Sequence, residues 1–235
     1  MNIAENLQKI KSQINKAEKT AGRNENSVKL VAVSKFHPVE EIEEAIKNGQ
    51  LLFGENRVQE AVQKFTQLKE KYPDIVLHII GQLQSNKVKN AVKISECIQS
   101  VDRLALVEEI EKQCAKINKK IDILFEFHTG EESKSGFEKE EDIEQILEMI
   151  KNGNFPHINP KGFMTMAPFT QEQSLIKKSF SMLKNLQAKM QQKFPEFELS
   201  ELSMGMSNDF ETAIAEGSTM VRIGTAIFGA RNYQA

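Results

Sequence analysis

The feature that most constrains the fold is a repeated alternation of short apolar segments with amphipathic segments or turns. Eight short segments rich in apolar and β-branched residues predict strands, at 30–34, 51–53, 75–81, 97–101, 121–127, 162–166, 197–203 and 219–223. Strict alternation of strands and helices is typical of a parallel sheet. Eight such units within 235 residues fit a closed α/β barrel, a (β/α)8 TIM barrel, better than an open doubly wound sheet.

An extra helix is predicted before the first strand, over 3–21. Its apolar residues recur at helical spacing and form one stripe: Ile3, Leu7, Ile10 and Ile14. No linker or low-complexity tract interrupts the pattern, so we expect a single domain over 1–235. Neither GxGxxG after the first strand nor GxxxxGK[ST] occurs, which removes the common nucleotide-binding fingerprints.

The charge balance gives no reason to expect nucleic acid or an anionic membrane as a partner. Lysine and arginine together number 31 against 33 acidic residues, for a net charge of -2. No apolar run is long enough to cross a bilayer, and the Met-Asn-Ile-Ala-Glu start lacks the pattern of a signal peptide. Cys97 and Cys114 form no CxxC pair, as expected for reduced thiols. We therefore expect a cytoplasmic protein, and we expect no metal site.

The first predicted strand ends in a lysine. Its residues, 30–34, are apolar next to one another rather than alternating, which indicates a strand buried on both faces. Lys35 follows, and Phe36-His37-Pro38 ends the strand. Lys35 could simply be the first solvated residue. Closure of a barrel, however, brings the eighth strand beside the first and places Lys35 in the barrel mouth.

Small residues follow the last two predicted strands, where phosphate commonly binds in such barrels. The segment 203–207, Ser-Met-Gly-Met-Ser, follows the seventh strand, and Gly224-Thr225-Ala226 follows the eighth. Free N–H groups at the start of a helix or turn can bind an anion, and the hydroxyls of Ser207 and Thr225 add donors. The alternative is that the glycines only serve tight turns and that Ser207 only caps a helix. The two loops together favour phosphate binding.

Lys35 and the phosphate loops together indicate a phosphorylated aldehyde as the ligand. A desolvated lysine can lose its proton and form a Schiff base with an aldehyde, so pyridoxal 5′-phosphate is the leading candidate. Arg222, late in the eighth strand, is expected to face the ligand rather than to form a surface ion pair. Because arginine does not give up its proton, it would keep a pyridine nitrogen unprotonated.

These residues resemble the pyridoxal phosphate homeostasis protein (YggS/PROSC) family, which shares the fold of the alanine racemase N-terminal domain. The resemblance implies a Schiff base on Lys35, Arg222 near the pyridine nitrogen, and Asn56 near the ring hydroxyl, unless Asn56 caps the following helix. It also implies that Ser207, Gly224 and Thr225 hold the phosphate. The motifs that carry it are 31–35, 53–60, 78–87, 130–136, 162–165, 202–207 and 217–229.

A racemase needs a base on each face of the substrate carbanion. In alanine racemase one base is a tyrosine, but Tyr72 and Tyr233, the tyrosines of this chain, do not lie at predicted strand ends. We therefore expect a protein that binds, buffers and delivers pyridoxal phosphate, with apo-enzymes as recipients and without robust catalysis. A monomer is expected, because the domain that pairs racemase subunits is missing. The alternatives are a pyridoxal phosphate-dependent amino-acid racemase and a Schiff-base aldolase.

The remaining histidines and lysines carry weaker signals. His78 is expected to pack inside the barrel, and His37, His128 and His157 to be loop or strand-end residues without convergent partners. His128 also lies in a segment, 127–129, that departs from the Val-Asn pair expected before the Gly-Glu-Glu-Ser-Lys motif, which leaves the role of this loop open. The following lysines are expected to form a solvated helix face, with a second anion or partner site as the alternative: Lys87, Lys89 and Lys93.

Overall fold

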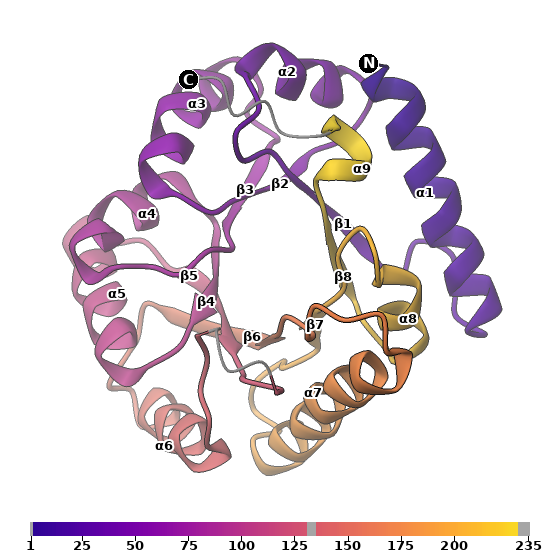
Figure 1. Ribbon diagram of the computed structural model, residues 1–235. Coiled ribbons are helices and arrows are strands. Elements are labelled where there is room, and N and C mark those ends of the chain that lie inside the picture. The colour runs from indigo at the N-terminus through magenta and orange to yellow at the C-terminus, as the bar shows by residue number, and fades with distance from the viewer. Residues whose placement is uncertain (1, 131–134, 230–235) are drawn as a thin grey trace.

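The computed structural model describes residues 2–130 and 135–229. Within them, eight parallel strands form a closed barrel in sequence order, with β8 returning to pair with β1 (Figure 1). The predicted (β/α)8 barrel is confirmed. The strands are β1 (Lys29–Val33), β2 (Leu52–Glu55), β3 (Val76–Ile79), β4 (Cys97–Val101), β5 (Ile121–Glu126), β6 (Ile158–Met164), β7 (Glu201–Ser203) and β8 (Met220–Ile223).

Helices surround the barrel, and the extra N-terminal helix α1 packs outside it against α2, α8 and α9 (Figure 1). A short 3₁₀ turn, η1 (Ser85–Lys87), precedes α4. No helix in the described part of the chain has the length and apolar character to cross a membrane. The helices are α1 (Ile3–Thr20), α2 (Val39–Lys47), α3 (Val58–Lys71), α4 (Val88–Ile94), α5 (Leu104–Ile117), α6 (Glu140–Lys151), α7 (Gln173–Lys193), α8 (Phe210–Ala215) and α9 (Thr225–Phe228).

Strand β1 shows why adjacent apolar residues are needed in this fold. Leu30 and Ala32 belong to the main core of the molecule, whereas Val33 lines a cavity at the mouth of the barrel. All residues from Leu30 to Val33 are buried, so both faces of the strand are covered, as expected for a parallel strand.

The register of β1 against β8 brings the two ends of the chain together. Val31 lies opposite Arg222, and Ala32 lies opposite Ile223. The residues that follow these strands, Lys35 and Gly224, therefore reach the same rim of the barrel.

Two strands begin four residues away from their predicted starts, a larger difference than at the other strand bounds. The seventh strand was expected over 197–203 but covers only Glu201–Ser203, because the Gln191 side chain binds the Phe197 carbonyl (2.8 Å) and the Leu199 N–H (2.9 Å) instead. The sixth strand begins at Ile158 rather than at residue 162. Pro160 lies within this added part, next to a register shift against β5, which is where a sheet tolerates proline.

Candidate functional site

The C-terminal ends of the strands surround a cavity of about 1010 Å³. Residues from the ends of seven strands, or from the loops that follow them, line this cavity, and they come from both ends of the chain. The structure brings all of the site residues singled out from sequence to this one cavity, namely Lys35, Asn56, Ser207, Arg222, Gly224 and Thr225.

Lys35 lies in a tight turn that follows β1. The N–H of His37 donates to the carbonyl of Ser34 at 3.1 Å, so Lys35 and Phe36 are the two central residues of the turn. Phe36 has a φ of 65°, a left-handed conformation that is unusual for a bulky residue and costs about 1–3 kcal/mol. Lys35 itself is half-buried and lines the cavity.

Arg222 is buried and oriented by neighbouring strands. Its Nη1 donates to the carbonyl and the hydroxyl of Ser203 at 2.8 and 2.7 Å, and its Nη2 donates to the Thr165 carbonyl at 2.8 Å. Burial lowers the pKa of Arg222 to about 10, while the carboxylates of Glu126 and Asp209 act in the opposite direction. Arg222 is therefore a protonated donor at neutral pH, and the alternative of a surface ion pair is wrong.

The loop after β8 places a helix start close to β1. A Cβ atom on Gly224 would lie 3.0 Å from the carbonyl oxygen of Val33, so only glycine allows this approach without a shift. Gly224 is the N-cap residue of α9, whose first N–H groups have no partner within the helix. Thr225 begins α9 and is exposed at the edge of the cavity.

The residues of the loop after β7 have different roles. Gly205 has a φ of 96°, and a Cβ there would lie 2.6 Å from the Cβ of Ala213, so this glycine serves the turn. Ser207 lines the cavity, and the N-cap residue of α8 is Asp209. The alternative that Ser207 caps this helix is therefore wrong.

Asn56 follows β2 and contacts the loop after β3. A Cβ on Gly81 would lie 2.5 Å from the carbonyl oxygen of Asn56, so glycine is required for these two loops to meet. The N-cap residue of α3 is Arg57, and no side chain in the described ranges caps that helix. The capping alternative for Asn56 is therefore wrong, and its side chain remains one of those that line the cavity.

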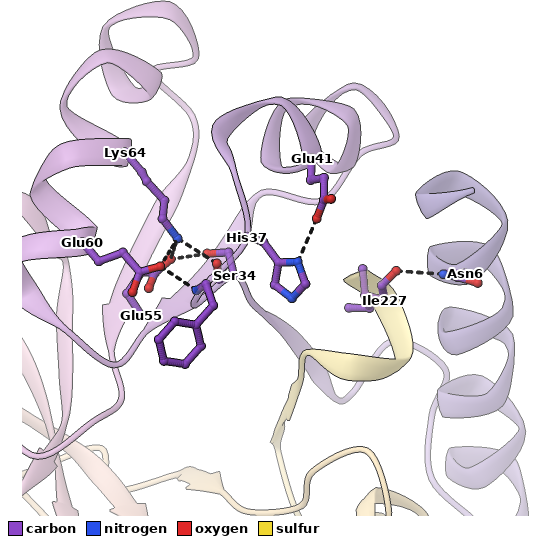
Figure 2. Close-up of polar contacts among 9 residues, drawn as sticks. Asn6, Ser34, His37, Glu41, Glu55, Glu60, Lys64 and Ile227 are labelled. Atoms are coloured by element: carbon purple, nitrogen blue, oxygen red, sulfur yellow. Dashed lines mark hydrogen bonds and ion pairs between the residues drawn. The ribbon is translucent and has the colours of Figure 1, made fainter. Parts of the chain in front are cut away.

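Sequence reasoning missed several residues of the cavity wall, among them Glu126 and His37. Glu126, at the end of β5, is 2 % exposed and accepts a hydrogen bond from the Ser135 hydroxyl at 3.2 Å. A carboxylate closing an apolar strand was the available signal. His37 was expected to have no convergent partners, but its Nδ1 lies 2.8 Å from Glu41 Oε2 (Figure 2). Its ring also lies 5.0 Å from that of Phe228.

His78 packs inside the barrel, as expected. Its Nδ1 lies 2.7 Å from the Gln99 side-chain nitrogen, and burial lowers its pKa to about 3. His157 also has a partner that the sequence did not reveal, since its Nδ1 lies 2.7 Å from Glu111.

The structure also places the predicted lysine face and one of the two tyrosines, whereas other predicted features lie outside the described ranges. Lys89 and Lys93 are exposed and Lys87 is half-buried, in agreement with a solvated face. Tyr72 follows α3, whereas Tyr233 and residues 131–134 of the loop after β5 lie outside the described residues. Within those residues there is no cluster of three or more potential metal ligands.

A family model described as alanine racemase, N-terminal domain, matches residues 6–232. A pyridoxal phosphate homeostasis protein from Pasteurella multocida is 39% identical over 235 residues, which is 99% of each chain. The chain belongs to the pyridoxal phosphate homeostasis protein family.

Solved structures agree with this family assignment. PipY of Synechococcus elongatus PCC7942, in a structure with PLP bound, is 35% identical with a TM-score of 0.84, covering 97% of this chain and 100% of PipY. Alanine racemase of Clostridium difficile 630 is 16% identical with a TM-score of 0.76, covering 100% of this chain and 57% of the racemase. The likeness to the racemase shows a shared fold alone.

Proposed function

We propose that this chain binds pyridoxal 5′-phosphate in the cavity at the barrel mouth and serves in intracellular homeostasis of this cofactor. The observation that carries the proposal is the meeting of an amine, a buried guanidinium and two hydroxyl-bearing loops in one cavity. This donor set fits a ligand with an aldehyde, a ring nitrogen and a phosphate. Membership in the homeostasis protein family and the PLP-bound structure of PipY support the same ligand.

Each donor fits one part of the cofactor. We assign the aldehyde carbon to the Nζ of Lys35, which would hold it covalently, and the phosphate to Ser207, Gly224 and Thr225 with the first N–H groups of α9. Asn56 is assigned to the ring hydroxyl. When bound, the cofactor supplies an electrophilic carbon attached to an electron-withdrawing ring.

Arg222 sets the electronic character of the site. Its pKa of about 10 keeps it protonated, and the carbonyls of Ser203 on β7 and of Thr165, just after β6, fix its orientation. A protonated guanidinium can only donate to the ring nitrogen, so that nitrogen stays unprotonated and the ring withdraws electrons less strongly. Such a site favours storage of the cofactor over carbanion chemistry.

The proposed role is therefore to hold, buffer and deliver the cofactor, without robust catalysis. Tyr72 supports this, because it lies between α3 and the start of β3, at the end of the barrel opposite the strand ends that form the cavity. We further propose that residues 1–235 form one domain that acts as a cytoplasmic monomer, with apo-enzymes that use pyridoxal phosphate as recipients.

The test combines a cofactor-transfer assay with a racemisation assay. Protein loaded with pyridoxal phosphate is expected to absorb visible light and to change its spectrum with borohydride. It is also expected to activate an apo-enzyme that receives the cofactor from it by diffusion. Alanine enantiomers should not interconvert at ordinary enzymatic rates. Racemisation that Lys35→Ala abolishes would contradict the proposal and favour the amino-acid racemase.

A further inference from the structure

A buried polar cluster lies directly behind the turn that carries Lys35, and none of the roles proposed above uses it. It consists of Ser34, Glu55, Glu60 and Lys64, here called the Lys64 cluster (Figure 2). Ser34 and Glu55 are fully buried, and Lys64 is 9% exposed although it lies on α3, a helix that otherwise turns its lysines to solvent or to surface pairs.

Lys64 is the centre of the cluster. Its Nζ donates to the Ser34 carbonyl at 2.8 Å and to Glu55 Oε1 at 2.9 Å, and it pairs with Glu60 Oε1 at 2.6 Å. An ammonium group has three protons, so these three acceptors satisfy it completely. Burial raises the pKa of the Glu55 carboxyl, and the charge of Lys64 is the main influence in the opposite direction.

The cluster binds the backbone on both sides of Lys35. On the preceding side, the Ser34 carbonyl accepts from Lys64 while the Ser34 hydroxyl donates to Glu55 Oε1 at 2.7 Å. On the following side, the N–H of Phe36 donates to Glu60 Oε1 at 2.5 Å. Figure 2 shows these contacts converging from β2 and α3 on the single turn after β1.

This turn needs outside support. Phe36 has a φ of 65°, a conformation that a bulky side chain rarely adopts and that persists only where surrounding contacts determine it. Arg57, at the start of α3, adds a contact 5.4 Å above the Phe36 ring. Without these contacts the turn would relax toward ordinary backbone angles, and the side chain of Lys35 would leave its present direction.

A buried ion cluster is weak evidence for stability, because a packed apolar replacement is often as stable. Its contribution here is fixed geometry at one turn. We propose that Lys64, with Glu55 and Glu60, is a positioning residue for Lys35 and sets the rate at which Lys35 captures an aldehyde. This inference rests on the proposed function.

The step that is positioned is an ordinary condensation. The Nζ of Lys35 forms a double bond to the aldehyde carbon, and the aldehyde oxygen leaves as water with the two protons of the neutral amine. The reaction needs no oxidant or further reactant. The rate of this step depends on how closely Nζ approaches the aldehyde carbon. The loops after β7 and β8 set the position of that carbon through the phosphate, independently of the turn. A small displacement of the turn therefore has a large effect on the rate.

The experiment compares Lys64→Met with a matched control, Lys69→Met. Lys69 lies on the same helix and pairs with Glu96 at 2.5 and 2.7 Å, away from the turn. The rate of covalent capture of pyridoxal phosphate is measured by stopping the reaction with borohydride and determining the mass of the protein. We expect capture to slow by about 10- to 100-fold in Lys64→Met, the effect of a misplaced reacting group, and to stay at the wild-type rate in Lys69→Met.

A second measurement separates positioning from a general structural role. Each substitution is repeated in a Lys35→Ala background, where only non-covalent binding remains, and the affinity for pyridoxal phosphate is expected not to change. Glu60→Leu, at a half-buried position that tolerates substitution better, should slow capture in the same direction. Hydrogen exchange at the Phe36 amide should become faster in both variants but not in Lys69→Met.

Three outcomes would overturn the inference: capture at the wild-type rate in both variants, an equal loss of capture and non-covalent affinity, or an unchanged Phe36 exchange rate. Failure of the proposed function looks different, since the wild-type protein itself would then show no borohydride-stable mass increase. In that case the Phe36 exchange rates still decide whether the cluster holds the turn.

Discussion

Strand β1 has a lysine beside a cavity at each end, and the two ends differ in how their polar groups are used. Lys29 begins the strand and lines a cavity of about 430 Å³ at the N-terminal end of the barrel. Its side chain is 56% exposed and pairs with Glu201. Lys35 follows the strand at the larger cavity and is half-buried in a turn held by the Lys64 cluster.

At the N-terminal end of the barrel, charged side chains are paired with one another or with a polar neighbour. Lys29 pairs with Glu201, Lys161 pairs with Glu198 at 3.2 Å, and Asn159 donates to Asp122 at 2.6 Å. At the C-terminal end, backbone carbonyls orient Arg222, and glycine allows the close approach of β8 to β1. The arrangement around each lysine, rather than the lysine itself, therefore distinguishes the candidate binding site from the solvated end of the barrel.

A line of hydrogen bonds crosses the barrel interior between the two cavities. Arg222 donates to the Ser203 hydroxyl (2.7 Å), Ser203 donates to Gln99 Oε1 (2.7 Å), and the Gln99 amide meets His78 Nδ1 (2.7 Å). His78 lines the cavity at the N-terminal end of the barrel, here called the lower end. Arg222 lines the cavity at the C-terminal end of the strands, here called the upper end. The line therefore runs from a charged guanidinium at one cavity to a neutral imidazole at the other.

The largest expected difference between the two ends is in covalent attachment. Lys35→Ala should abolish the borohydride-stable adduct with pyridoxal phosphate, while Lys29→Ala keeps it. Lys35→Ala should retain some non-covalent binding through the phosphate loops, measured by equilibrium dialysis. Complete loss of binding in this variant would show that the loops contribute less than the comparison requires.

The next effect concerns acid stability, which we assign to His78 at the lower end. The pKa of His78 falls from 6.5 to about 3 on folding, so the unfolded chain binds the extra proton between these values and stability declines as pH drops through them. Between pH 7 and pH 4 this amounts to roughly 3 kcal/mol. His78→Asn keeps an acceptor for Gln99 but does not titrate. Urea unfolding at both pH values should show a smaller acid loss for this variant, and an equal loss would contradict the assignment.

A smaller effect is expected at the phosphate loop of the upper end. Thr225→Ala removes one hydrogen bond to a charged group, which weakens binding of pyridoxal phosphate by roughly 1.5–3 kcal/mol. Titration in the Lys35→Ala background isolates this contact from the covalent link. An unchanged affinity would remove Thr225 from the proposed site.

The smallest effect is expected for the ion pair at the lower rim. Lys29→Met breaks its pair with Glu201, but the lysine side chain is 56% exposed, so the free energy of unfolding should change by about 1 kcal/mol or less. Pyridoxal phosphate binding should not change. A marked loss of affinity would mean that the two ends of β1 are coupled more closely than their contacts indicate.

The sequence predicted the order of elements and the end of the barrel at which the candidate site residues meet, because both follow from apolar periodicity and from small polar residues after strands. It predicted strand bounds less well where side chains outside the strand decide them, as Gln191 does before β7. The start of β6 was placed too late because of Pro160. A proline within an apolar run argues against a strand, and the register shift that accommodates this proline is visible only in the structure.

The Lys64 cluster could not be predicted from periodicity. Lys64 reads as one more solvated lysine on α3, and its acceptors come from the ends of β1 and β2 and from its own helix. The pairing of β1 with β2, and the return of α3 beside them, bring these groups together. His37 was misjudged because closure of the barrel places Phe228, from the other end of the chain, beside its ring.

The most direct measurement is peptide mass mapping of the wild-type protein after loading with pyridoxal phosphate and reduction with borohydride. The account predicts one modified peptide, with the added mass on Lys35. Modification of Lys29 or another lysine in preference to Lys35, or no modification at all, would contradict it.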